Sequence, residues 1–236
     1  MGMIETKDLI KQFDGVMVLN LPALKINRGE SFGLVGNNGA GKTTFFSLIL
    51  DIIEASSGMV LSHGINVRQS EHWKSYTGSY LDERFLIDFL TPEEYFDFIC
   101  SINRLTTAEY QGFLDRFQEF FNGEVLGTNK YIRALSRGNQ KKVGIAAALM
   151  SHPDVIILDE PFPNLDPTTV IRLKNILKEL QRNTQVTMLI SSHDLNHVTE
   201  VCKRIAILEK GIIVHDLKTD ENTLEQLQAY FDPIKE

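Results

Sequence analysis

The sequence predicts an α/β protein with a mainly parallel sheet, an antiparallel β subdomain at the N-terminus and an inserted α-helical subdomain. Three observations predict this fold. Short β-like segments separated by turns fill the first 35 residues, helical spacing dominates residues 85–121, and apolar runs flank a helix within residues 155–191. Strand–helix–strand order is typical of parallel sheets, because parallel neighbours need a crossover connection, whereas strands joined by tight turns pair antiparallel.

The N-terminal part is expected to consist of short strands. Asp14-Gly15 and Asn27-Arg28-Gly29-Glu30 supply turns between them. The expected segments are strands at Met3–Leu9, Val16–Leu19, Leu24–Ile26 and Ser31–Val35, a helix at Thr43–Leu50, and a hairpin formed by Gly58–Leu61 and Ile65–Val67.

Residues 85–121 form the expected helical region, which is rich in Phe, Tyr and Glu. Thr91-Pro92-Glu93-Glu94 is a favourable helix start, because Thr caps a helix, Pro suits its first position and acidic residues suit its first turn. Aromatic residues at helical spacing are more often part of a core than of a base-stacking surface. We therefore interpret them as core packing.

β-like runs return in the C-terminal part of the chain, with an amphipathic helix at Thr168–Leu180 between the first two. No internal repeat and no low-complexity linker interrupts the sequence, which indicates a single unit. The expected strands are Val155–Leu158, Thr187–Ser191, Ile205–Leu208 and Ile212–His215, and a polar helix begins at Thr223.

A complete G-x-x-x-x-G-K-T phosphate loop lies between the strand at Ser31–Val35 and the helix that follows it. Its glycines let successive backbone N–H groups turn toward one anion, and the helix N-terminus adds further unpaired donors. The lysine can reach the β- and γ-phosphates, and the threonine hydroxyl can bind Mg²⁺. This loop predicts binding of a nucleoside triphosphate, and it comprises Gly36, Asn37, Asn38, Gly39, Ala40, Gly41, Lys42 and Thr43.

Two adjacent carboxylates, Asp159 and Glu160, follow the apolar run Val155–Leu158. Because neighbouring side chains along a strand point in different directions, the pair can divide its roles. Asp159 would hold the Mg²⁺ shell, and Glu160 would face the γ-phosphate and polarise the attacking water. An apolar strand that ends in acids is a weak signal alone, but it becomes strong downstream of a complete phosphate loop.

Ser136 and Gly138 stand at the start of a helix rich in small residues, Lys141–Met150. A helix N-terminus with a serine and a glycine can receive an anion. The same residues are also consistent with an ordinary N-cap serine and a neighbouring glycine. The residues alone leave both interpretations open.

Composition excludes several classes of protein. Charged residues make up 23% and hydrophobic residues 43%, as in ordinary globular proteins. The net charge of −7 argues against nucleic acid as the main partner and gives no support for attachment to anionic lipid. No apolar stretch approaches the ~20 residues needed to cross a bilayer, and we expect no signal peptide. Cys100 and Cys202 are isolated, as packing cysteines of a cytosolic protein would be.

Together these motifs resemble those of the ATP-binding cassette (ABC) ATPases, specifically the separate ATP-binding subunit of an ABC transporter. Leu135–Asn139 is similar to the LSGGQ signature, Glu160–Pro167 to the stretch from the catalytic glutamate into the D-loop, and Ser191–Asp194 to the segment with the switch histidine. The motifs occur in family order across roughly residues 3–215.

The resemblance implies a RecA-like phosphate-loop NTPase core within a single ABC ATPase domain over residues 1–236. Residues 1–84 and 151–215 would form the ATP-binding core with its β subdomain. Residues 85–150 would form the helical subdomain that carries the signature, and residues 216–236 a C-terminal tail helix.

The resemblance also implies how ATP and Mg²⁺ are bound. Phe13 would stack on the adenine, and Thr43 with Asp159 would hold Mg²⁺. The phosphates would be held by Gly36, Asn37, Asn38, Gly39, Ala40, Gly41, Lys42, Thr43 and Thr44.

The resemblance further implies how ATP is hydrolysed. Glu160 would act as the general base, and His193 would contact the γ-phosphate and sense its loss. Ser136 and Gly138 would reach ATP bound by a second cassette, so that two cassettes close around shared ATP and part after hydrolysis. Whether the second cassette is identical or different is left open.

Two motifs depart from the family pattern. No glutamine occurs in Ser79–Arg84, where the family places its Q-loop, and Asp82 or Glu83 could approach Mg²⁺ instead. That segment normally contacts the membrane subunit. In the signature, Arg137 replaces a glycine and Asn139 replaces a glutamine, while both anion-receiving positions remain.

The leading hypothesis is an enzyme that hydrolyses ATP at the cytoplasmic, inner face of a membrane and drives a separately encoded transmembrane permease. The signature and the acidic coupling segment are most similar to those of bacterial drug, antibiotic or sodium exporters, so export is the expected direction. An alternative is a non-transport ABC ATPase that acts on ribosomes or DNA, although such members usually carry two cassettes, basic linkers or long coiled coils. A third possibility, ATP binding without turnover, is disfavoured by Glu160 and His193.

Overall fold

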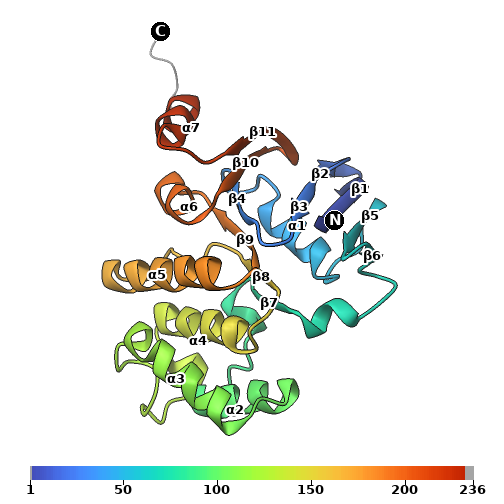
Figure 1. Cartoon of the computed structure of the whole chain (residues 1–236). Helices are drawn as coiled ribbons and strands as arrows, with labels where there is room; N and C mark the ends of the chain where they lie inside the picture. Colours follow the sequence, from blue (N-terminus) through green and yellow to red (C-terminus); the bar gives the residue numbers. More distant parts are fainter. Residues whose placement is uncertain (1, 232–236) are drawn as a thin grey trace.

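The computed structural model describes residues 2–231, which form two sheets and the helices around them (Figure 1). The first sheet has five antiparallel strands in the order β2-β1-β5-β6, with β3 paired to β1. The turn at Asp14 and Gly15 between β1 and β2 has positive φ at both residues, as tight hairpins require. The strands are β1 (Gly2–Phe13), β2 (Val16–Leu21), β3 (Lys25–Asn27), β5 (Ser57–Ser62) and β6 (Ile65–Asn66).

The second sheet has six strands in the order β11-β10-β4-β9-β8-β7. All its neighbours are parallel except β10 and β11, which form a hairpin. The fold class predicted from the sequence, an antiparallel β unit beside a mainly parallel α/β core with inserted helices, is confirmed. The strands are β4 (Ser31–Val35), β7 (Thr77–Tyr80), β8 (Val155–Leu158), β9 (Thr187–Ser192), β10 (Arg204–Glu209) and β11 (Ile212–Lys218).

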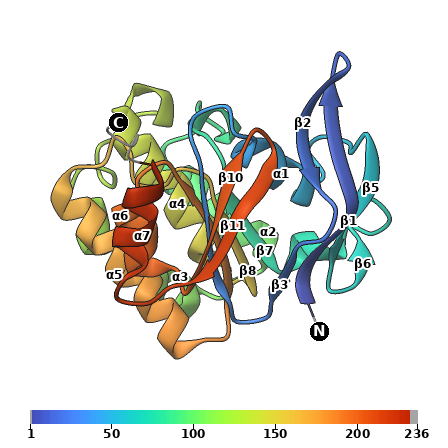
Figure 2. The same ribbon diagram turned by 90° about the horizontal axis from the view of Figure 1, so that it is seen from above.

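The helices lie mainly on the side of the second sheet that faces away from the first sheet. In Figure 2 the antiparallel sheet stands on one side of β10 and β11, and α5, α6 and α7 stand on the other. The helices are α1 (Lys42–Ile49), α2 (Pro92–Asn103), α3 (Thr107–Phe121), α4 (Arg137–Met150), α5 (Pro167–Asn183), α6 (Leu195–Val201) and α7 (Thr223–Phe231). Short 3₁₀ turns occur at His72–Ser75, Glu83–Phe85 and Ile132–Ala134.

Two hydrophobic cores lie on opposite faces of the second sheet. Along β8, Ile156 and Leu158 join the core formed with α4, α5 and α6, whereas Val155 and Ile157 join the core formed with α1 and the antiparallel sheet. This division follows from the alternation of side chains along a strand. The buried rings of α1, Phe45 and Phe46, belong to the second core, where burial of each contributes about 1.5–3 kcal/mol. The phosphate-loop helix is thus fixed between the two sheets.

The aromatic helical region is a packed core. Thr91 and Thr106 begin α2 and α3 with capping boxes completed by Glu94 and Glu109. The buried rings between these helices are Phe96, Phe113, Phe117, Phe120 and Phe121. The interpretation of the aromatic residues as core packing is therefore confirmed.

Several elements differ from the sequence expectations. Strand β7 and helix α6 were not expected, because both are short and neither has a clear apolar period. Helix α4 begins at Arg137, four residues earlier than expected, since Ser136 caps it. The tail helix begins at Thr223 as expected, and residues 232–236, which the prediction included, lie outside the described residues. The subdomain boundaries at residues 84, 150 and 215 stay predictions.

The parallel strands bring three chain segments to one edge of the second sheet. Val35 of β4 pairs with Ser192 of β9, and Leu158 of β8 pairs with Ile190 of β9, so these strands end side by side. The segments that follow β4, β8 and β9 therefore meet there, as expected at the carboxyl edge of an open α/β sheet. Among the described residues, no helix combines the length and the apolar character that crossing a bilayer requires.

Candidate functional site

The phosphate loop follows β4 and leads directly into α1. Gly39 and Gly41 have φ values of +83° and +109°, which only glycine adopts without strain. A Cβ at Gly36 would lie 2.3 Å from the carbonyl oxygen of Leu208, so that position also excludes a side chain. No side chain caps the N-terminus of α1 at Gly41, which leaves its first N–H groups available to an anion.

Lys42 extends back over this loop. Its side chain is 6% exposed, and its ammonium donates to the carbonyl oxygen of Gly36 at 2.6 Å and lies 3.2 Å from Oε1 of Glu160. An ammonium at this place can exchange its carboxylate partner for a phosphate, because both are anionic oxygen acceptors.

Asp159 follows β8 and is buried between two hydroxyl groups. Thr43 donates a hydrogen bond to Oδ2 and Ser191, from β9, donates one to Oδ1. Burial raises the pKa of this carboxyl above its usual value, although both hydroxyl donors act in the opposite direction. The structure thus brings together Thr43 and Asp159, the two residues expected at Mg²⁺.

These oxygens fit Mg²⁺ only with help from other ligands. Thr43 and Asp159 offer one hydroxyl and one carboxylate, and the described residues contain no group of three or more His, Cys, Asp or Glu side chains placed to hold a metal ion. A magnesium ion that is bound by one or two protein oxygens takes its remaining ligands from phosphates and water. The residues present therefore fit Mg²⁺ that arrives with a nucleotide.

Glu160 occupies an unusual backbone conformation beside Asp159. Its φ is +46°, in the left-handed region that non-glycine residues rarely adopt. Its N–H donates to Oγ of Ser191 at 2.8 Å, and its Oε2 lies 2.9 Å from Nδ1 of His193. Because Oε1 meets Lys42, the carboxylate lies between a cation and an imidazole.

Ser136 and Gly138 lie apart from this cluster. Ser136 caps α4 by accepting a hydrogen bond from the N–H of Asn139 at 3.2 Å, and it is exposed. A Cβ at Gly138 would lie 2.6 Å from the carbonyl oxygen of Asn164, so the signature glycine packs against the loop after Glu160. Within residues 2–231, no hydrogen bond joins Ser136 to the phosphate loop.

Asp82 and Phe13 also lie outside the cluster. Oδ1 of Asp82 accepts hydrogen bonds from the N–H and Nε of Arg84, at 2.9 and 2.8 Å. These bonds lower the pKa of Asp82, although burial acts to raise it. In the described part of the chain, Asp82 has no hydrogen bond to Thr43 or Asp159. Phe13 ends β1 with an exposed ring, and the ammonium of Lys11 lies 4.5 Å from its centre. The Mg²⁺ role of Asp82 and the adenine role of Phe13 stay predictions.

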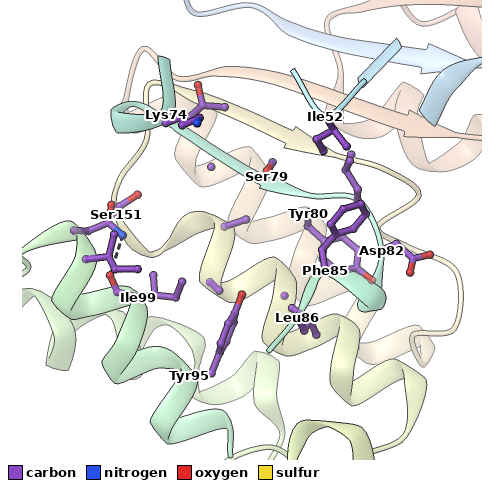
Figure 3. Close-up of a pocket in the computed structure, with 18 residues that line it drawn as sticks. Ile52, Lys74, Ser79, Tyr80, Asp82, Phe85, Leu86, Tyr95, Ile99 and Ser151 are labelled. Atoms are coloured by element: carbon purple, nitrogen blue, oxygen red, sulfur yellow. Dashed lines mark hydrogen bonds between the residues drawn. The ribbon is translucent and has the colours of Figure 1, made fainter. Parts of the chain in front are cut away.

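Asp82 instead lines a groove of about 290 Å³ between β7, α2 and α4. Figure 3 shows Tyr80, Asp82 and Phe85 near one another on the segment that includes and follows β7, with Tyr95 and Ile99 of α2 on the far side. Phe85 is 58% exposed. The groove thus combines exposed apolar surface with an acidic edge.

Two residues of the site were missed by sequence reasoning. The sequence indicates Ser191 only as part of the segment around His193, yet Ser191 is hydrogen bonded to both Asp159 and the backbone of Glu160. The sequence indicates Lys141 only as a helical residue, yet its ammonium donates to the carbonyl oxygen of Glu160 at 2.8 Å. The end of an apolar strand was the available signal for Ser191; no local signal marked Lys141.

Comparison with known proteins agrees with this geometry. The chain matches the family model described as ABC transporter over residues 19–163. It is similar to an uncharacterized ABC transporter ATP-binding protein of Methanocaldococcus jannaschii, with 33% identity over 92% of this chain and 78% of that protein. It is also similar to the bacitracin transport ATP-binding protein BcrA of Enterococcus faecalis, with 31% identity over 92% of this chain and 70% of that protein.

A solved structure described as the ATP-binding subunit of an ABC transporter has the same fold. Its TM-score is 0.83 at 26% identity, and the match covers 98% of this chain and 95% of that one.

Proposed function

The chain belongs to the ABC transporter family, and on that premise we propose that it is the subunit that hydrolyses ATP to drive a separately encoded transmembrane permease. One observation carries the proposal. Glu160 lies between Lys42 and His193, while the adjacent Asp159 accepts a hydrogen bond from Thr43. A lysine that would bind phosphate, a pair that would hold Mg²⁺ and a carboxylate that would act as base are thus grouped beside the phosphate loop.

ATP binding would begin at the phosphate loop. The uncapped N–H groups of α1 and the backbone between Gly36 and Thr44 would surround the phosphates. Lys42 would move its ammonium from Glu160 to the γ-phosphate, which frees the carboxylate. Mg²⁺, held by Thr43 and Asp159, would neutralise charge that develops on the phosphate oxygens.

Hydrolysis would then use Glu160 as the base. A water molecule attacks the γ-phosphorus, its proton passes to Glu160, and the bond from that phosphorus to the β–γ bridging oxygen breaks to give ADP and phosphate. His193 is 49% exposed in its side chain and already 2.9 Å from Oε2, so it can orient this carboxylate and contact the γ-phosphate. The adenine would stack on the exposed ring of Phe13.

We further propose that ATP is shared between two cassettes. Ser136 and Gly138 stand at the exposed N-terminus of α4, and Ser136 is hydrogen bonded only within its own helix start among the described residues. They would therefore contact ATP held by the phosphate loop of a second cassette, which is either a second copy or a related chain. Loss of the γ-phosphate would remove the shared anion and let the cassettes part.

The permease would dock at the groove beside β7. Residues Ser79–Asp82 line this groove and belong to the segment Ser79–Arg84, which resembles the part of the family that contacts the membrane subunit. The groove also exposes apolar side chains such as Phe85 and Ile102. Docking there would hold the chain peripherally at the inner face of the membrane. The sequence of the signature at Leu135–Asn139 and beyond favours export. The name of the relative from Enterococcus faecalis refers to bacitracin transport, which is consistent with a transport role.

Copurification with a multi-span membrane protein encoded next to this chain tests the proposal. Vesicles that contain both proteins should hydrolyse ATP faster than the chain alone, and the rate should fall when Glu160→Gln is introduced. A chain that hydrolyses ATP but copurifies with ribosomes or DNA instead would overturn the transport role. The net charge of −7 gives no support for such a nucleic acid partner.

A further inference from the structure

Lys141 is a buried lysine whose ammonium lies against the loop that follows β8. The residue is 5% exposed, and Nζ donates to the carbonyl oxygens of Glu160 at 2.8 Å and of Pro163 at 2.9 Å. An ammonium has three donors, and burial is costly unless they are used. Two of the three are used on backbone groups of a single loop, so Lys141 of α4 fixes the path of that loop.

The part of the loop that Lys141 holds is strained. Glu160 has a φ of +46°, and such a conformation persists only where the surroundings enforce it. Ser191 and Lys141 hold this backbone conformation, one at the N–H and the other at the carbonyl oxygen of Glu160. Oγ of Ser191 accepts the N–H of Glu160 at 2.8 Å, and Lys141 donates to its carbonyl oxygen. Because the backbone conformation sets where the side chain leaves the chain, these two contacts aim the carboxylate of Glu160.

The surroundings of Lys141 link it to the groove. Its ammonium lies 6.0 Å from the ring centre of Tyr80, a residue that lines the groove (Figure 3). Burial lowers the pKa of Lys141. Four carboxylates around the ammonium act in the opposite direction, those of Glu83, Glu160, Asp159 and Asp82. Two of these acids follow β7 and two follow β8, so the lysine lies between the groove and the site.

We propose that Lys141 is a positioning residue for ATP hydrolysis, which holds the backbone of Glu160 so that its carboxylate faces the phosphate loop. This inference rests on the proposed function, since it assigns Lys141 to the base of that reaction. Lys141 would act through the peptide group of Glu160 and through Pro163.

The test compares two buried lysines on the same helix. Lys142 is 2% exposed and pairs with Oε2 of Glu124 at 2.8 Å, away from Glu160. Lys141→Met should lower kcat by about 10- to 100-fold, since misplacement of a catalytic group by an ångström has that effect, and should leave the Kd for ATP within about twofold. Lys142→Met should keep kcat within about threefold of wild type at a similar loss of Tm. Lys141→Arg restores donors and charge and should recover part of the lost kcat.

Wild-type turnover reports on the proposed function, and only the ratio of variant to wild type reports on Lys141. Equal losses of kcat in Lys141→Met and Lys142→Met at matched Tm would overturn the positioning role, because both would then reflect general destabilisation. A kcat of Lys141→Met within threefold of wild type would also overturn it. If the Met variant does not fold, Lys141→Leu, which likewise removes the donors and the charge, replaces it with the same expected direction and the same criteria.

Discussion

The carboxyl edge of the parallel sheet and the groove beside β7 differ in how their side chains are satisfied. At the edge, hydroxyl donors meet Asp159, and Lys42 and His193 meet Glu160, so a small charged ligand would find its partners already in place. In the groove, apolar side chains such as Phe85 and Ile102 are 58% and 61% exposed. The polar groups of the edge are therefore already paired, whereas the groove leaves apolar surface exposed to solvent.

This difference suggests that the two regions fail differently when they are changed. Substitutions at the edge should alter ATP binding or turnover in the isolated chain. If the groove is the docking site proposed above, substitutions there should alter only the response to the proposed membrane subunit.

The largest effect is expected at Glu160. Glu160→Gln should lower the turnover of ATP by about 10²- to 10⁴-fold, because the water loses its base, while ATP is still bound. The shared anion then persists, so a closed dimer should accumulate. Phosphate release and size-exclusion chromatography with ATP measure both outcomes. Glu225→Gln, an exposed position on α7, serves as the control. A purely monomeric Glu160→Gln protein in saturating ATP would contradict the shared site.

Lys42→Ala should abolish ATP binding, because the phosphates lose their buried cation. For wild type, ATP at 100 times its Kd should add about 2.7 kcal/mol to the free energy of unfolding, and the variant should lose this gain. Thermal melts with and without ATP measure the effect, with Lys7→Ala as an exposed control. An undiminished ATP-induced rise in Tm in Lys42→Ala would show that the phosphate loop does not bind as proposed.

Asp82→Ala tests the groove side of the comparison. It should weaken the coupling free energy between the nucleotide site and the proposed membrane subunit by about 0.5–2 kcal/mol, so that this subunit stimulates the ATPase rate less. Basal ATP binding should be unchanged. The ATPase rate of the isolated chain is compared with that of the complex, and Asp115→Ala on the exposed face of α3 is the control. Equal losses in the isolated chain and the complex would place Asp82 at the nucleotide instead.

The smallest effect concerns stability and pH. The pKa of Asp159 is raised by burial, so the folded state of the nucleotide-free chain favours the protonated carboxyl and loses stability as pH rises through that pKa. Asp159→Asn removes this loss of stability. The difference in Tm between the variant and wild type should therefore increase from acidic to neutral pH, by about 2–4 °C for each kcal/mol of unfolding free energy that the variant gains.

Asp194→Asn provides the opposite case for the same measurement. Hydrogen bonds from Asn196 lower the pKa of Asp194 although burial acts to raise it, so its contribution to stability is present at neutral pH and is lost on acidification. Its Tm relative to wild type should therefore fall, not rise, as pH increases. Parallel pH trends in the two variants would show that burial of Asp159 is not the cause.

The features that could be predicted from the sequence are those formed by contiguous residues. The phosphate loop, the pair Asp159 and Glu160, and the cap at Ser136 each occupy a short stretch with a defined local conformation. Strands β4 and β8 were predicted with their observed bounds, because each is a short, fully buried run bounded by turn residues. Strand β7 was not predicted, since Thr-Gly-Ser-Tyr is only four residues long, contains a glycine and lacks an apolar alternation; its pairing with β8 holds it as a strand.

The sequence by itself determined that this chain carries a phosphate loop, two carboxylates after a buried strand and the motif order of an ABC cassette. Only the tertiary structure decided that Ser191 holds Asp159, that Lys42 meets Glu160, and that Lys141 holds the backbone of Glu160. The reason is physical: these contacts join residues on separate strands and helices, and their partners are selected by the parallel pairing of β4, β8 and β9 and the packing of α4 against the sheet.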